Sequence, residues 1–266
     1  MHGPRTAPAL ATIALKGFVT VGIVGLALAG GVQSALADGG SSIASAAPVV
    51  AGQQEFGNTV NGADSTVSCF TNGGGTFQYS WWALGAVAGD SFTIDWEGAS
   101  STTELDVYAV GTTDFTFPQT DTVATQQPNA NLKAELKFVA NASGSMPLRF
   151  VDCGAGAPYD FTVTVKHAVR LSLPAARTLS RQGTINVGVH SPEGGSISDS
   201  SLTVALQISS GGKWTTIGAS AVSNSRASVT YRVAASLRHR TVRLRALATG
   251  GSYLTETSVV QKVTTT

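Results

Sequence analysis

The chain has 266 residues, with 17 Lys plus Arg against 16 Asp plus Glu, a net charge of +1, and only 12% charged residues. An average soluble domain carries about 25% charged residues, so this surface must depend on Ser, Thr, Asn, Gln and Gly. The composition argues against helical bundles, coiled coils and a nucleic-acid partner, and the 30 Gly favour a turn-rich β protein. The length allows one large domain or two of ordinary size.

The N-terminal segment, residues 1–37, is predicted to be a signal peptide. Arg5 and Lys16 supply positive charge, an apolar run covers residues 18–30, and Ala35-Leu36-Ala37 gives the small residues before a cleavage site. The run is shorter than the roughly 20 residues of a membrane span, so we expect no membrane span after cleavage. The expected product is secreted or extracellular, and at most loosely cell-wall-associated; an uncleaved anchor is the alternative. Residues 38–51, rich in Gly, Ala and Ser, predict a flexible lead-in.

Charge divides the rest of the chain into two halves. Residues 50–167 contain four basic and twelve acidic residues, a net charge of −8, whereas residues 168–266 contain eleven basic and three acidic residues, a net charge of +8. A change of sign this abrupt predicts two modules, an acidic one over residues 52–167 and a basic one over residues 168–266, joined near residues 166–174.

The two cysteines are predicted to form one disulfide. Cys69 and Cys153 lie near the two ends of the acidic module. An exported protein meets an oxidising environment, where two cysteines most simply pair. A bridge that closes a loop of about 85 residues would stabilise the fold by roughly 4 to 5 kcal/mol on the entropic model. A reactive thiol pair is the alternative, but the two cysteines lack the close spacing and basic neighbours that lower a thiol pKa.

The acidic module alternates apolar and polar residues with the period of a β-strand. Phe92, Ile94 and Trp96 share one face, and Leu105 and Val107 repeat the pattern. Further strands are predicted at residues 76–84, 132–140, 146–151 and 159–166. Short strands separated by turns favour an antiparallel sandwich.

The order of these strands resembles a known family. An aromatic strand (Tyr79-Ser80-Trp81-Trp82) precedes a Gly-Asp turn, the strand over residues 92–96, and Glu104-Leu105-Asp106-Val107-Tyr108. The series ends at Tyr159-Asp160-Phe161-Thr162-Val163. It resembles the bacterial pre-peptidase C-terminal domain, a small β-sandwich appended to exported proteins. The resemblance implies a jelly-roll-like accessory module, sometimes associated with calcium or with an extracellular polymer.

A calcium site is the sharpest chemistry that the acidic module offers. Its candidate ligands are hard carboxylate oxygens close together in sequence, of the kind that Ca²⁺ binds six to eight at a time. They are Asp90, Asp95, Glu97, Glu104 and Asp106. The spacing does not match an EF-hand, and the alternative is that these acids form the solvated face of a sheet.

The adjacent Trp81 and Trp82 must point to opposite faces of their strand, so one belongs to the core and the other is free to be exposed. We take Trp82 as a candidate for stacking on a polymer. Packing beneath a neighbouring strand is the alternative.

The basic module is predicted to be a second sandwich. Seven strands are expected, with Trp214 as a core anchor, at residues 169–173, 184–190, 202–209, 214–217, 227–233, 241–247 and 258–264. Seven strands in about 100 residues favour an immunoglobulin-like fold. The run from Lys213-Trp214 through Ser228-Val229-Thr230-Tyr231-Arg232 to Val242-Arg243-Leu244-Arg245 is similar to Ig-like modules of actinobacterial exported proteins. The glycine usual in those modules before the central strand is missing at Ser225-Arg226.

Six arginines of the basic module lie within twenty residues: Arg226, Arg232, Arg238, Arg240, Arg243 and Arg245. Strand alternation points Val242 and Leu244 inward, and it points Arg243 and Arg245 outward with Arg232. Such a stripe would hold an anionic cell-wall polymer, teichoic or uronic, through bidentate guanidinium contacts. A solubilising face and docking onto the acidic module are the alternatives.

No catalytic constellation is visible in the sequence. The chain beyond the signal has three histidines, His167, His190 and His239, and none stands at metal-ligand spacing. No nucleophile elbow, zinc-binding helix or phosphate loop is found. We therefore expect two tandem β-sandwiches without a cofactor other than calcium, acting as a non-catalytic binding module. The competing function is a structural spacer or partner of another exported protein, such as a peptidase. The sequence does not indicate an oligomeric state.

Overall fold

The computed structural model describes residues 39–68, 76–113, 115, 122–126, 129–153 and 156–266. Strands dominate the described residues and no α-helix occurs among them, so the predicted all-β fold is confirmed. No helix among these residues is long and apolar enough to cross a membrane. The predicted signal peptide lies outside the described residues.

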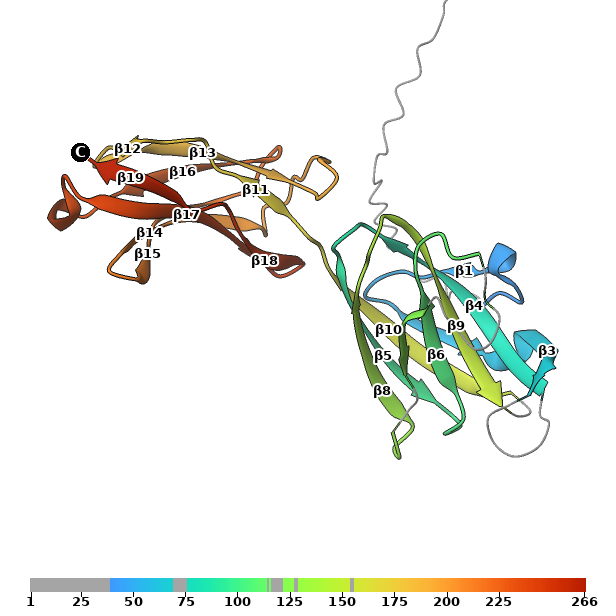
Figure 1. The fold of residues 1–266 in the computed structure, drawn as a ribbon. Helices are drawn as coiled ribbons and strands as arrows, with labels where there is room; N and C mark the ends of the chain where they lie inside the picture. Colours follow the sequence, from blue (N-terminus) through green and yellow to red (C-terminus); the bar gives the residue numbers. More distant parts are fainter. Residues whose placement is uncertain (1–38, 69–75, 114, 116–121, 127–128, 154–155) are drawn as a thin grey trace, which may run out of the picture. The chain divides into compact units, whose positions relative to one another are not determined.

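Strands β1 to β10 form two sheets, which we call the acidic sandwich (Figure 1). The first sheet has the order β1-β4-β9-β6-β7, with β3 also paired to β4. Its strands are β1 (Ala47–Pro48), β3 (Gly62–Ser68), β4 (Thr76–Ala86), β6 (Glu104–Tyr108), β7 (Thr122–Gln126) and β9 (Gly144–Cys153). The second sheet has the order β2-β10-β5-β8. Its strands are β2 (Gln54–Asn58), β5 (Ser91–Gly98), β8 (Lys133–Val139) and β10 (Pro158–Lys166). The chain crosses from the first sheet to the second between β4 and β5, and it returns between β5 and β6. It crosses again between β8 and β9, and once more between β9 and β10.

The core of the acidic sandwich is aromatic, as the period-two pattern predicts. Phe92, Ile94 and Trp96 are all buried on the inner face of β5. The ring of Phe150 stacks on that of Tyr159 with their centroids 3.9 Å apart. These side chains belong to strands of both sheets, so their burial holds the two layers together.

Residues 39–51 are more ordered than a flexible lead-in. Gly40 and Trp81 exchange two backbone hydrogen bonds, of 2.7 and 2.9 Å, and β1 then pairs in parallel with β4. Between them lies a single 3₁₀ turn, Ile43–Ser45. A Cβ on Gly40 would lie 2.1 Å from the carbonyl oxygen of Ser45. Gly40 is therefore needed because two stretches of backbone approach closely at this point. A Gly-rich composition is the same for a flexible segment and for a closely packed one, so the sequence alone does not separate the two.

Strands β11 to β19 form the basic sandwich. A three-stranded sheet has the order β11-β13-β16, and the facing sheet has the order β12-β19-β17-β14-β15, with β18 paired to β17. The strands are β11 (Arg170–Ser172), β12 (Thr178–Leu179), β13 (Gln182–His190), β14 (Thr203–Ser210), β15 (Lys213–Ala221), β16 (Arg226–Arg232), β17 (Thr241–Gly250), β18 (Tyr253–Thr257) and β19 (Gln261–Thr265). Short 3₁₀ turns are η2 (Thr59–Asn61) in the acidic sandwich and η3 (Ala235–Leu237) in the basic one.

The core of the basic sandwich is aliphatic and shares no residue with the aromatic core. Val242, Leu244 and Ala246 are buried, which confirms the predicted inner face of β17. Trp214 is wrong as a core anchor: its side chain is half-exposed and lies outside this cluster. It belongs to an outer face of the sheet.

Candidate functional site

The outer face of the six-stranded sheet carries cations from two neighbouring strands, β17 and β19, and Trp214 from β15. The register of β19, β17, β14 and β15 places Lys262 opposite Arg243, Arg243 opposite Ser209, and Ser209 opposite Trp214. Arg245 lies two residues further along β17, opposite Gln207. We call this surface the β17 face, defined by Gln207, Ser209, Trp214, Arg243, Arg245 and Lys262.

The indole of Trp214 anchors both arginines of the β17 face. The guanidinium carbon of Arg245 lies 4.0 Å from the Trp214 ring centroid, and that of Arg243 lies 5.5 Å away. Arg245 Nε donates a 3.0 Å hydrogen bond to Oε1 of Gln207, and Arg243 Nη2 donates to Ser209 Oγ at 3.4 Å. These contacts fix the guanidinium planes before any ligand arrives, which reduces the entropy lost on binding.

Within residues 156–266, no ion pair neutralises the cations of the β17 face. Arg243 and Lys262 are directly opposite each other on neighbouring strands, an arrangement of like charges that destabilises a sheet. Residues 156–266 are all described, and no Lys or Arg among residues 168–266 forms an ion pair there.

The predicted arginine stripe is divided between two sheets. Arg232 is exposed on β16, in the three-stranded sheet, whereas Arg243 and Arg245 lie on β17 in the facing sheet. Period-two alternation correctly shows that all three side chains point outward. It does not show which sheet each strand joins, and the prediction of one continuous face was wrong for this reason.

Trp82 cannot stack on a polymer, because its side chain is fully buried in the core of the acidic sandwich. The indole Nε1 donates a 2.7 Å hydrogen bond to the hydroxyl of Tyr159, and the ring packs edge-on against Phe161. Trp81 points to the opposite face, as predicted, but only 6% of it is exposed. Both faces of β4 are therefore covered at this point.

The five predicted calcium ligands are not brought together. Asp95 and Glu97 are exposed on β5 of the four-stranded sheet, whereas Glu104 and Asp106 lie on β6 of the other sheet. Asp90 is buried in a turn, where Oδ1 accepts the Ala168 N–H at 2.9 Å and Oδ2 lies 3.1 Å from His167 Nδ1. Among the described residues no group of three or more metal-binding side chains occurs.

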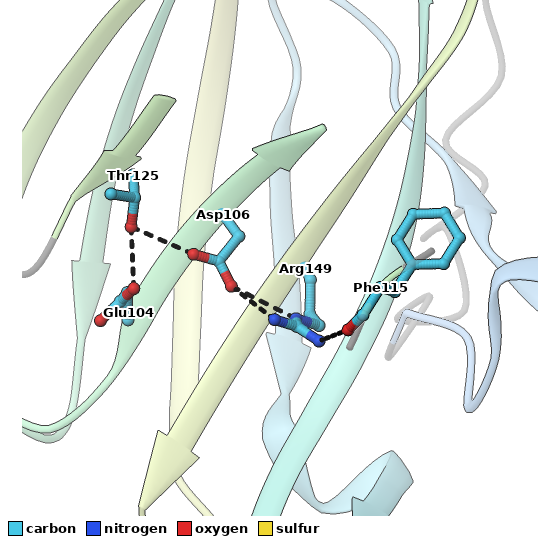
Figure 2. A network of polar contacts seen from close by, with 5 residues as sticks. All are labelled: Glu104, Asp106, Phe115, Thr125 and Arg149. Atoms are coloured by element: carbon cyan, nitrogen blue, oxygen red, sulfur yellow. Dashed lines mark hydrogen bonds and ion pairs between the residues drawn. The ribbon is translucent and has the colours of Figure 1, made fainter. Parts of the chain in front are cut away.

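Asp106 instead binds a cation of the chain itself, Arg149 of the adjacent strand β9 (Figure 2). Both Nε and Nη2 of Arg149 donate to Asp106 Oδ2, at 3.2 and 3.0 Å, and Nη1 donates to the carbonyl of Phe115 at 3.1 Å. Thr125 Oγ1 donates to Glu104 at 2.8 Å and to Asp106 at 3.0 Å. The guanidinium carbon also lies 5.4 Å from the Trp81 ring centroid and 5.3 Å from that of Tyr108.

Burial controls the electrostatics of this network. It raises the pKa of Asp106 to about 6, against the opposing pull of Arg149 and with the added repulsion of Glu104. Burial likewise raises the pKa of Tyr108. The alternation predicts that the outer side of β6 is solvated, but this side carries the buried Asp106–Arg149 ion pair. Phe115 packs edge-on against both Trp81 and Tyr108 beside that pair. An occupied, aromatic-covered ion pair is suited to structure rather than to calcium binding.

The Cys69–Cys153 disulfide stays a prediction, because Cys69 lies outside the described residues. Cys153 is the last residue of β9, with its backbone opposite Phe77 of β4.

Comparisons with known proteins found only weak structural similarity. No protein-family model and no curated protein matches the chain. Among solved structures, a periplasmic inhibitor of g-type lysozyme from Aeromonas hydrophila is 16% identical with a TM-score of 0.32, over 45% of this chain and 95% of that one. The glycoside hydrolase domain of Endo-D from Streptococcus pneumoniae is 13% identical with a TM-score of 0.25, and 37% of its chain is covered by 79% of this one. At these TM-scores neither likeness says what this chain binds.

Proposed function

We propose that the protein is an exported, non-catalytic binding module whose β17 face holds an anionic extracellular polymer. The observation that carries this proposal is the pair Arg243 and Arg245 at the Trp214 ring, with Lys262 opposite Arg243 and no ion pair to any of the three within residues 156–266. A protein stabilised only by its surface charges would place acids opposite these cations. The polymer would be phosphate-bearing or carboxylate-bearing, since a guanidinium fork matches both groups.

Trp214 supports a polymer with ring-shaped units. The indole is half-exposed on β15, and Arg245 is stacked over it. A sugar ring seated against the free part of the indole would place its acidic substituents within reach of Arg243 and Arg245. The same face would then supply both stacking and charge.

The test measures affinity for immobilised teichoic acid and polygalacturonate, with neutral dextran as the reference polymer. Wild-type protein is expected to bind at least one polyanion and to lose affinity as salt rises. The double variant Arg243→Gln/Arg245→Gln should bind about tenfold or more weakly, equivalent to about 1.4 kcal/mol.

The matched control is Arg232→Gln/Arg238→Gln, which makes the same change in net charge on exposed residues outside the β17 face. It should retain nearly all of the affinity. Equal losses in the two double variants would show that net charge alone binds the polymer, and would overturn the assignment to the β17 face. No binding to any polymer, with one exported protein co-purifying from the native host, would favour the spacer or partner function instead.

A further inference from the structure

The outer face of the three-stranded sheet has a polar pocket of about 510 Å³, separate from the β17 face. Its floor is a row across three strands, because Ser172 of β11 and Arg226 of β16 both lie opposite Gly188 of β13. Asn186 and His190, on either side of Gly188 along β13, complete the polar lining. A volume of this size is in the range of small-molecule sites, about 300 to 1,000 Å³, and well beyond a bare ion.

The missing side chain at Gly188 creates the pocket. A Cβ at this position would lie 2.2 Å from Ser172 Oγ and 3.3 Å from His190 Nε2. The hydroxyl and the imidazole therefore approach each other above a bare stretch of backbone. Any larger residue at position 188 would fill the floor and push Ser172 aside.

A strained turn forms one wall of the pocket. Asn224 and Ser225 both have left-handed backbone angles, with φ of 50° and 59°, although neither is glycine. Ser225 is held in place by Ile197, whose N–H donates to Ser225 Oγ at 2.9 Å and whose carbonyl accepts the Ser225 N–H at 2.7 Å. Such backbone persists only where the surroundings enforce it.

The pocket presents donors and positive charge without a carboxylate. Arg226 is exposed and makes no ion pair within residues 156–266, all of which are described. Asn186 Oδ1 already accepts the Ser228 hydroxyl at 2.7 Å, so its amide NH₂ is left to donate elsewhere. Arg170 lies directly opposite His190 on β11 and adds a further cation at the edge. Among the residues that the structure describes, none that lines the pocket is acidic.

We propose that this pocket binds the phosphate group of a sugar-sized phosphorylated ligand. Arg226 provides the bidentate contact, and the Ser172 hydroxyl and the Asn186 amide donate to the remaining oxygens. The volume left beside the phosphate accommodates the sugar. This site is independent of the proposed function, and it stands even if the β17 face binds no polymer.

The test is an NMR titration that follows the backbone amide signals of the full-length protein. Glucose 1-phosphate is added in one titration, and glucose is added in a parallel one. Glucose 1-phosphate should shift the signals of Asn186, Gly188 and Ser225 saturably, and glucose should not. Arg226→Gln should weaken glucose 1-phosphate binding about tenfold or more. Arg232→Gln, the same change on the same face of the same strand but outside the pocket, should leave affinity within about twofold.

A second variant guards against misfolding of the first. Asn186→Asp keeps an acceptor for Ser228 but adds a negative charge to the pocket, so it should abolish binding while leaving the spectrum otherwise native. The Arg243→Gln/Arg245→Gln protein should bind glucose 1-phosphate normally, which separates this site from the β17 face. Equal weakening by Arg226→Gln and Arg232→Gln, equal binding of glucose, or the absence of saturable shifts would each overturn the proposal.

Discussion

At the scale of single residues, the Asp106–Arg149 pair shows how a charged side chain can change its role once it is buried. From the sequence, Asp106 is a candidate calcium ligand on a strand in which apolar and polar residues alternate. In the structure its carboxylate is fully buried, and one of its oxygens takes two hydrogen bonds from Arg149. Removing one partner of such a pair leaves the other charge buried without compensation, which commonly costs about 3 to 5 kcal/mol.

The raised pKa of Asp106 predicts a pH dependence of stability. The folded pKa of about 6 exceeds the value of about 3.9 expected in the unfolded chain, so the folded state binds more protons between these limits. The free energy of unfolding should therefore fall by roughly 2 to 3 kcal/mol as pH rises from about 4 to about 6, and then level off. Chemical denaturation across this range should show the slope in wild-type protein and its loss in Asp106→Asn.

His167 provides the control for this measurement. Its hydrogen bond to Asp90 raises its pKa, so the stability it contributes is present below the unfolded value of about 6.5 and is lost as pH rises through the folded value. The two groups act in the same direction but in different pH windows. His167→Gln should leave the slope between pH 4 and 6 in place, and a slope that disappears in His167→Gln but survives in Asp106→Asn would contradict the assignment.

At the scale of elements, the period-two alternation of apolar and polar residues predicts where strands lie, but it does not predict which strands pair with each other. The strands at residues 92–96, 159–166, 184–190 and 241–247 are all present. Strands β1, β2, β3, β7, β12 and β18 are missing from the prediction, and β1 and β12 have only two residues each, too few to show a period. The β17 face depends on register: Trp214 meets Arg243 only because both lie beside Ser209, and no local pattern encodes that pairing.

Gly218 gives a test of packing at this scale. It lies on β15 beside a register shift in the pairing with β14, and a Cβ there would lie 2.2 Å from the backbone carbonyl oxygen of Thr230. Because a backbone atom cannot swing away, Gly218→Ala should destabilise the basic sandwich by about 1 to 3 kcal/mol. Gly251→Ala is the matched control, since nothing lies within 4 Å of its added Cβ. Thermal unfolding of the two variants side by side checks the difference.

At the scale of the whole molecule, the two cores are separate clusters with different chemistry, one aromatic and one aliphatic. Phe161→Ala in the acidic sandwich should cost about 3 to 5 kcal/mol, and Leu244→Ala in the basic sandwich about 2 to 5 kcal/mol. Since no residue is common to both clusters, each substitution should lower one calorimetric transition and leave the other in place. A single transition that shifts equally in both variants would show that the sandwiches unfold as one unit.

The like-charge pair of Arg243 and Lys262 ties the stability of the basic sandwich to whether its surface is occupied. Their repulsion is present in the empty folded state and is relieved when the chain unfolds, when salt screens it, or when an anion bridges the two cations. The empty protein therefore carries an electrostatic repulsion that the proposed polyanion would remove. A neutral side chain at position 243 would remove the same repulsion permanently, so a variant that no longer binds should be more stable than the protein that does.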